Sequence, residues 1–231
     1  GWHDWYLSSN INDRSSLDKH LMKNTPIAGV PKNLKNTVYS FEYNNFQQLK
    51  KIVQEQNIGV IKMEVMRNHE PKDNFLNKVR KLATDKKIVL IFDECTSGFR
   101  QTFGGLHKYY NISPDIAIFG KALGNGYAIN AIIGKKSVMD HAESSFISST
   151  FWTERIGPTA ALETLNQMEK TKSWKKISEL GIYFRKILKD LAEKNGINIK
   201  IKGLLAIPSF LIQNDINRDI LLVPIVALII F

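Results

Sequence analysis

The sequence predicts an α/β fold, in which a mostly parallel sheet is sandwiched by helices. Segments with helical periodicity alternate with segments of strand character. The strand segments are apolar along their whole length, which is typical of parallel strands that are covered on both faces. After Pro158 the chain changes to long helical segments, and we therefore place a domain boundary near residue 165.

The first elements are two helices and a strand between them. Residues 46–53 follow a helical period, and the apolar run 58–65 is a predicted buried strand. Pro71 then interrupts the chain. Asp73 is a candidate N-cap for a helix whose apolar side comprises Phe75, Leu76, Val79, Leu82 and Ala83.

The later elements continue this alternation and then become helical. Strands are predicted at residues 87–92, 115–119 and 128–133, and a glycine-rich stretch occupies 98–105. Helices are predicted at 158–170 and 173–195, and Gly196 stands where a helix C-cap is expected.

The net charge of +10 at pH 7 raises the question of nucleic-acid binding. Binding to a phosphate backbone requires basic residues on one face, whereas the lysine pairs of this chain are spread along its length. We therefore predict a solvated, lysine-rich surface and no nucleic-acid partner.

The cysteine and histidine content and the C-terminal segment bear on whether the chain is a disulfide-bonded, a metal-binding or a membrane protein. The single cysteine, Cys95, excludes an internal disulfide and suits a reducing cytoplasm, where we place the protein. The histidines are widely spaced and show no metal-ligand pattern, so no metal is expected. The apolar residues 220–231 are fewer than the ~20 that span a bilayer. A buried strand is the favoured interpretation of this segment, and a membrane anchor is the alternative.

Chemically useful side chains follow two of the predicted strands. Asp93 and Glu94 come directly after residues 87–92, and Lys121 lies in the glycine-rich turn after residues 115–119. Ligands of open α/β sheets bind outside the carboxyl ends of the strands, so both groups are expected to face one crevice. A lysine that forms a Schiff base and an aspartate that keeps a pyridine nitrogen protonated suit pyridoxal 5'-phosphate (PLP). A nucleotide loop is disfavoured, because Ala122 stands where that motif needs Ser or Thr.

Several segments resemble class III aminotransferases, which are PLP enzymes of fold type I, and especially the branch of glutamate-1-semialdehyde 2,1-aminomutase. The segments are 91–100 (IFDECTSGFR), 103–127 (FGGLHKYYNISPDIAIFGKALGNGY) and 148–155 (SSTFWTER). The resemblance implies a PLP-binding large domain over residues 1–165 and the start of a small α+β C-terminal domain over 166–231. Both are expected to be incomplete, the first at its N-terminus.

The resemblance also implies roles for individual residues. Lys121 matches the Schiff-base lysine and Asp93 the aspartate paired with the pyridine nitrogen, and both are candidate catalytic residues. Thr150 matches a threonine that reaches the cofactor phosphate across a homodimer interface. Thr96 falls where the family places a side chain near the ring hydroxyl, commonly Gln or Met. Glu64 matches a family glutamate, although the proline that follows it there is replaced.

The implied function is amino transfer between an amino donor and a carbonyl substrate, performed by a homodimer with no membrane partner. One alternative is glutamate-1-semialdehyde 2,1-aminomutase activity. The bulky, charged residues 151–155 favour the transferase, because that branch has a small, glycine-containing gating segment there. The other alternative is an inactive fragment that acts only as a dimerising module, which the lack of the family's upstream phosphate loop would favour.

Overall fold

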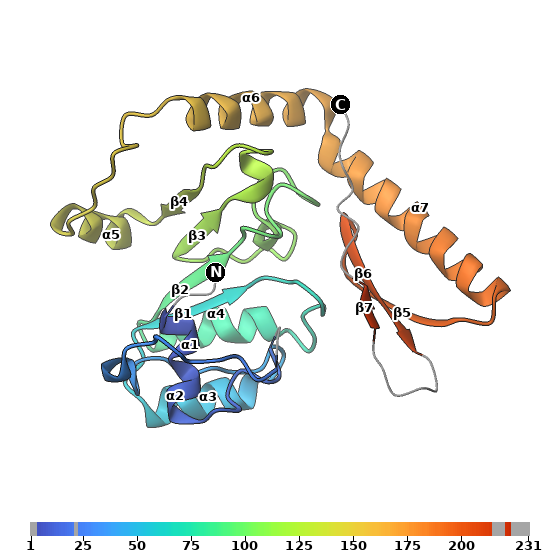
Figure 1. The fold of residues 1–231 in the computed structure, drawn as a ribbon. Coiled ribbons are helices and arrows are strands. Elements are labelled where there is room, and N and C mark those ends of the chain that lie inside the picture. Colours follow the sequence, from blue (N-terminus) through green and yellow to red (C-terminus); the bar gives the residue numbers. More distant parts are fainter. Residues whose placement is uncertain (1–3, 21–22, 214–219, 223–231) are drawn as a thin grey trace. The chain divides into compact units, whose positions relative to one another are not determined.

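A computed structural model of the 231-residue chain describes residues 4–20, 23–213 and 220–222. The chain divides into two compact units, Gly1–Ile58 and Gly59–Phe231 (Figure 1). The first unit contains the helices α1 (Asp4–Leu7), α2 (Ser9–Asn12) and α3 (Phe46–Glu55) and the 3-10 helix η1 (Lys32–Leu34).

Helix α3 confirms the helix expected at residues 46–53. Asn45 is its N-cap, and its side-chain oxygen accepts a hydrogen bond from the backbone N–H of Gln48 at 3.1 Å. The helix buries Leu49, while its other side is mostly exposed. The period of 3.6 residues in the sequence therefore corresponds to one apolar stripe that packs inward.

The second unit is built on a four-stranded sheet in the order β1-β2-β3-β4. Its strands are β1 (Val60–Glu64), β2 (Val89–Asp93), β3 (Ile116–Phe119) and β4 (Ala131–Gly134). The first three are parallel, and β4 runs antiparallel to β3. The prediction of a mostly parallel sheet with helices is confirmed.

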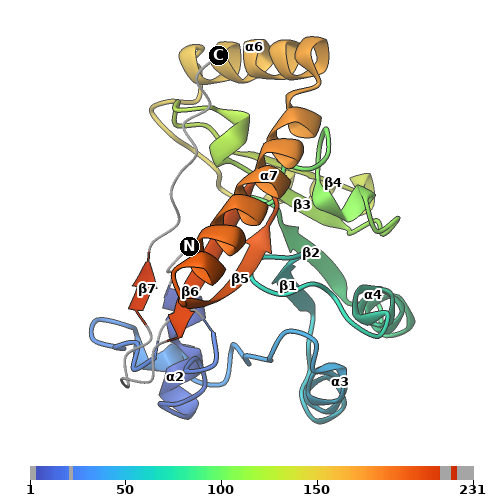
Figure 2. The same ribbon diagram turned by 90° about the vertical axis from the view of Figure 1, so that its right-hand side faces the viewer.

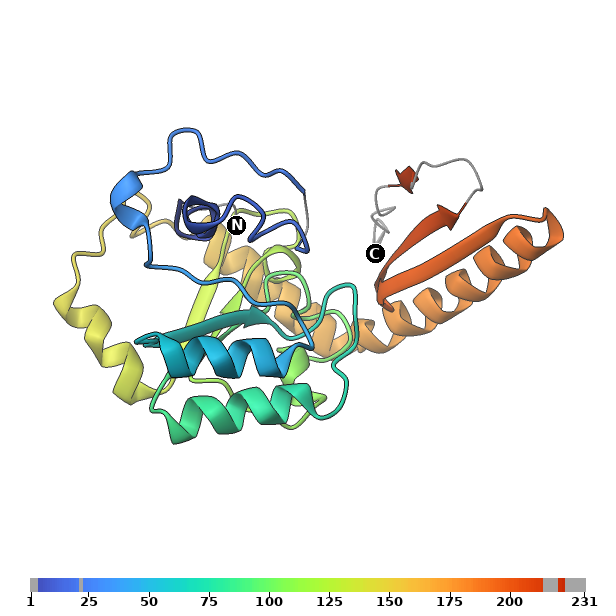
Figure 3. The same cartoon turned by 90° about the horizontal axis from the view of Figure 1, so that it is seen from below.

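Helix α4 (Phe75–Asp85) lies beside the sheet and contacts β2 (Figure 3). Its buried residues are Phe75, Leu76, Val79 and Ala83, nearly the apolar side expected from the sequence. The predicted N-cap is wrong by one residue, because Asn74 and not Asp73 occupies that position. Both residues have left-handed backbones, with φ of 50° and 57°, and Asn74 makes no side-chain capping bond.

The two faces of the sheet differ in burial. Leu90 and Phe92 are fully buried on one face, where Ala117 and Phe119 pack against Leu123 and against α6 (Ile156–Thr171). Side chains alternate along a strand, so Lys62 and Asp93 lie on the opposite face. That face is more accessible, and it carries the polar groups described below.

The C-terminal elements form a separate antiparallel sheet beside a long helix. Helix α7 (Ser173–Lys194) runs along β5 (Asn198–Leu204) and β6 (Ile207–Gln213), and β6 also pairs with β7 (Ile220–Leu222) (Figure 2). At Gly181 a Cβ atom would lie 1.9 Å from the carbonyl oxygen of Leu205, so only glycine allows this close approach. The helices expected after Pro158 are confirmed, and the boundary near residue 165 stays a prediction.

Short elements complete the second unit. They are η2 (Leu106–Lys108), η3 (Lys121–Leu123), α5 (Lys136–Met139) and η4 (Asp140–Ser144). Of the apolar C-terminal segment, β7 is a strand as favoured by the sequence, and residues 223–231 lie outside the described residues. Among the described helices, none combines the length and the apolar character that a membrane crossing requires.

Candidate active site

The carboxyl ends of the parallel strands bring the predicted site residues to one edge of the sheet. Glu64, the last residue of β1, pairs in register with Asp93, the last residue of β2, and Asp93 pairs with Ile118 of β3. Lys121 follows the end of β3 and begins η3. Strand order thus places residues that are far apart in sequence at a shared edge.

Asp93 is a partly buried carboxylate with two identified donors. Its Oδ1 accepts a hydrogen bond from the backbone N–H of Cys95 at 3.2 Å, and its Oδ2 lies 3.2 Å from Nζ of Lys62. Burial raises the pKa of Asp93, but the Cys95 N–H and the Lys62 charge outweigh burial and lower the pKa below its ordinary value. The site therefore holds an ionised carboxylate at neutral pH.

The amine of Lys121 is oriented by a neighbouring threonine. Nζ of Lys121 donates a hydrogen bond to Oγ1 of Thr96 at 2.8 Å, and Thr96 is 8% exposed. The backbone of Lys121 is left-handed, with φ of 49°, a conformation that costs a residue with a Cβ on the order of 1 kcal/mol. Such strain persists where the surrounding structure imposes it, and it is common at functional sites.

Asp93 and Lys121 act electrostatically on the same neighbours. Burial raises the pKa of Glu64, the Arg67 charge lowers it, Asp93 raises it and Lys121 lowers it. Burial also raises the pKa of the Cys95 thiol, as Asp93 does, while Lys121 again lowers it. The two predicted catalytic charges therefore face one region of the sheet edge.

A buried carboxylate fixes the loop that carries Thr96. Glu94 is fully buried, and its Oε1 accepts the backbone N–H of His107 at 2.9 Å and lies 2.9 Å from Nδ1 of the same histidine. Its Oε2 accepts the hydroxyl of Ser97. At Gly98 a Cβ would lie 2.7 Å from both the Glu94 carbonyl oxygen and the Phe119 ring, so glycine is required there. This packing gives Thr96 a defined position.

Thr150 is not brought to this cluster by any interaction in the described part of the chain. It lies exposed in a turn between η4 and α6, beside Phe151 and Trp152, which are 75% and 70% exposed. Among the hydrogen bonds of the described residues, none joins Thr150 to Lys121 or Asp93. Of the four predicted site residues, the structure thus groups Lys121, Asp93 and Thr96 at the sheet edge.

Sequence reasoning missed Lys62. A signal was present, because a lysine interrupts the apolar run 58–65 two residues before Glu64, and residues with this spacing share one face of a strand. The register alone does not predict that its amine reaches Asp93. Among the described residues, no group of three or more His, Cys, Asp or Glu side chains could hold a metal ion.

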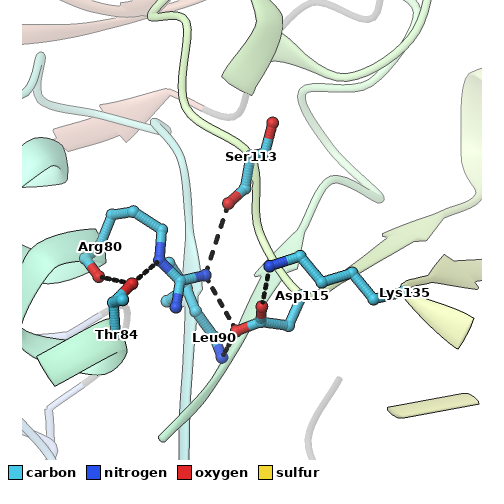
Figure 4. A network of polar contacts seen from close by, with 6 residues as sticks. All are labelled: Arg80, Thr84, Leu90, Ser113, Asp115 and Lys135. Atoms are coloured by element: carbon cyan, nitrogen blue, oxygen red, sulfur yellow. Dashed lines mark hydrogen bonds and ion pairs between the residues drawn. The ribbon is translucent and has the colours of Figure 1, made fainter. Parts of the chain in front are cut away.

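A second carboxylate lies at the opposite edge of the same sheet (Figure 4). Asp115, just before β3, accepts Arg80 Nη1 and the backbone N–H of Leu90 on Oδ2, at 2.9 and 2.8 Å, and Lys135 Nζ on Oδ1 at 2.7 Å. Arg80 also donates to Oγ1 of Thr84 and to the carbonyl oxygen of Ser113. This network ties α4, β2, β3 and the end of β4 together.

Comparison with known proteins identifies relatives over most of the chain. The family model described as aminotransferase class-III matches residues 44–223. The chain is 31% identical over 224 residues to 3-aminobutyryl-CoA aminotransferase from Cloacimonas acidaminovorans (strain Evry), covering 93% of this chain and 50% of the relative. It is 35% identical over 179 residues to glutamate-1-semialdehyde 2,1-aminomutase from Nitrosopumilus maritimus (strain SCM1), covering 73% and 42%.

Solved structures show the same fold. The FumI protein from Sphingopyxis sp. MTA144, solved with PLP, is similar with a TM-score of 0.78 at 22% identity, over 90% of this chain and 54% of that chain. An omega-transaminase from Sphaerobacter thermophilus has a TM-score of 0.77 at 20% identity, over 92% and 51%. This chain spans about half the length of the curated relatives named above.

Proposed function

This chain belongs to the class III aminotransferase family, and we propose that it is part of a PLP-dependent aminotransferase. The substrates are an amino donor and a carbonyl acceptor, as in the aminotransferases among its relatives. The observation that carries the proposal is the presence of both an ionised Asp93 and an oriented Lys121 amine at the carboxyl edge of the sheet.

The residues at this edge fit the two reactive ends of PLP. An ionised carboxylate suits a protonated pyridine nitrogen, and Asp93 is ionised and only partly exposed. A primary amine suits the aldehyde, and Lys121 presents one that is held by Thr96. When bound, PLP supplies an electron-withdrawing ring that stabilises negative charge on the substrate Cα.

The side chains of this chain then have distinct tasks. With PLP bound, Nζ of Lys121 would be the group that holds the cofactor aldehyde, and as a free amine it would act as the base for the proton at the substrate Cα. The Asp93 carboxylate would hold the proton on the ring nitrogen. Oγ1 of Thr96 accepts a hydrogen bond from the Lys121 amine and so limits its orientation.

We further propose a homodimer in the cytoplasm in which Thr150 contributes to the phosphate site of the partner. The proposal is supported by the exposed apolar segment around Thr150, in which Phe146 is 99%, Phe151 75% and Trp152 70% exposed. Exposed aromatic residues in one segment are typical of protein interfaces. The division into a large domain, 1–165, and a small domain, 166–231, belongs to the same proposal.

An aminomutase is the second candidate, because aminomutases occur among the relatives at 31–35% identity. The bulky Phe151 and Trp152 favour the transferase, since an aminomutase must retain its intermediate in the site. Turnover that requires a separate amino donor and keto-acid acceptor identifies a transferase. Conversion of glutamate-1-semialdehyde alone identifies the mutase.

The central test is covalent attachment of PLP to Lys121. The purified chain mixed with PLP is expected to develop a visible absorption band, and Lys121→Ala is expected to abolish it. Borohydride reduction followed by peptide mass spectrometry should locate the cofactor on Lys121. The control is Lys136→Ala, which removes an exposed lysine paired with Asp140 on a short helix. A spectrum of free PLP, with no labelled Lys121, would favour an inactive dimerising module.

A further inference from the structure

The middle residue of β1, Lys62, forms an ion pair with the candidate catalytic residue Asp93. Lys62 pairs in register with Ile91, two residues before Asp93, and its side chain reaches diagonally across to β2. Its Nζ lies 3.2 Å from Oδ2 of Asp93. The Lys62 side chain is 50% exposed and that of Asp93 18%, so the cation is the more accessible partner.

Both carboxylate oxygens of Asp93 have a partner, but one partner is fixed in the backbone and the other is a flexible side chain. Oδ1 accepts the backbone N–H of Cys95, which belongs to the ordered turn after β2. Oδ2 is held by an amine on a long, flexible stem that extends toward solvent. Half-exposed ion pairs of this kind are weak, because water solvates the released ammonium well. Oδ2 is therefore the oxygen that can exchange its partner.

A protonated ring nitrogen needs the same kind of oxygen that Lys62 now holds. Both groups are cations that seek one carboxylate, and the backbone N–H on Oδ1 leaves them to compete for Oδ2. Two cations at one carboxylate oxygen also repel each other. Binding of the ring is therefore expected to weaken the contact of the Lys62 amine with Asp93 and to favour its move into water.

We propose that Lys62 is a temporary counter-ion of Asp93, which it pairs with in the absence of cofactor and releases when the ring nitrogen of PLP binds. The inference rests on the proposed function. Its consequence is that Lys62 positions the carboxylate but lowers the affinity for PLP, since its ion pair must be broken on binding. Lys62 is thus a positioning residue that acts through Asp93.

The test compares the dissociation constant for PLP of Lys62→Met with that of the unaltered chain. Each constant is measured by titrating PLP and following the visible absorption band. The signal that Lys121→Ala gives under the same conditions is subtracted as background. Lys62→Met is expected to bind PLP roughly fivefold more tightly, with a larger difference at low salt. Lys81→Met is the matched control, because it removes an equally charged lysine paired with Asp85 on α4 and should leave the ratio near one. Lys62→Gln serves as a second variant, and circular dichroism verifies that each variant is folded.

A benzene-ring analogue of PLP, which has no ring nitrogen, distinguishes an effect of Lys62 on the ring nitrogen from a general effect on cofactor binding. It should bind the unaltered chain and Lys62→Met equally, because it does not compete for Asp93. PLP binding that is equal or weaker in both Lys62 variants would overturn the counter-ion role and leave the proposed function standing. Failure of the unaltered chain to bind PLP covalently would overturn the proposed function and this inference together.

Discussion

The two edges of the central sheet each carry one aspartate, and they use it differently. At the amino edge Asp115 accepts two side-chain cations and one backbone N–H, and Arg80 in this network is 19% exposed (Figure 4). At the carboxyl edge Asp93 accepts one backbone N–H and a half-exposed lysine. The pKa of each carboxyl is lowered although burial alone would raise it. The contrast shows that a lowered pKa by itself does not distinguish a structural carboxylate from a functional one.

What distinguishes them is Arg80, because the two lysine partners, Lys135 of Asp115 and Lys62 of Asp93, are exposed to a similar degree. Arg80 is held by Thr84 and by the Ser113 carbonyl as well as by Asp115, so its guanidinium is fixed on several sides. In the described residues Lys62 has Asp93 as its one ion-pair partner. The amino edge is thus suited to holding α4 against the sheet, and the carboxyl edge to taking up a ligand.

The largest expected difference between the two aspartates is in enzymatic activity, which should depend on Asp93 at the carboxyl edge. Asp93→Ala is expected to lower the rate of amino transfer on the order of 10²–10³-fold, because the ring nitrogen loses its counter-charge. Its free energy of unfolding should change by less than about 1 kcal/mol, since the lost ion pair is half exposed. Steady-state kinetics and urea unfolding measure the two quantities. A large stability loss without a rate effect would place Asp93 with the structural carboxylates.

The next effect is on stability at the amino edge. Asp115→Asn is expected to destabilise the protein by about 2 kcal/mol, because the largely buried Arg80 loses its counter-charge, whereas Lys135 is 56% exposed and adds little. Urea unfolding measures this change. Asp140→Asn, which removes an exposed partner of Lys136 on a helix, should cost less than about 0.5 kcal/mol. Equal effects of the two substitutions would show that the Asp115 network contributes little.

The smallest expected effect is the pH dependence of the difference in unfolding free energy between the unaltered chain and Asp115→Asn. The pKa of Asp115 is lowered from 3.8 in the folded chain, so the stabilisation it gives is present above 3.8 and is lost as pH falls through the folded-state pKa. The difference in unfolding free energy between the unaltered chain and Asp115→Asn should therefore narrow on acidification below about pH 4. A difference that stays constant down to pH 2 would contradict an ionised, paired Asp115.

Much of the fold follows from patterns that are local in sequence. The apolar runs and helical periods place β1 to β3, α3, α4 and the two late helices, because burial of one stripe or one face determines each element. The N-cap of α4 was misplaced because Asp73 and Asn74 both adopt left-handed backbones readily, and sequence does not tell which one adjoins the helix.

The candidate site was predictable in part for the same reason. Lys121 and Asp93 follow strands, and the rule that ligands bind at the carboxyl ends of strands applies to both. The hydrogen bond between Lys121 and Thr96 and the ion pair of Lys62 with Asp93 depend on side-chain reach between different segments, which periodicity does not encode. The proposed role of Thr150 concerns a partner subunit, so the folding of one chain does not reveal it.

The left-handed backbone of Lys121 has a consequence for what this position would otherwise hold. Glycine adopts a φ of 49° without steric penalty, and asparagine tolerates it better than most residues. If backbone conformation alone mattered, glycine or asparagine would be the most favourable residue in the turn after β3. Lysine is less favourable than either residue at this φ, and it supplies a basic, nucleophilic primary amine, which glycine lacks and which the amide nitrogen of asparagine does not replace.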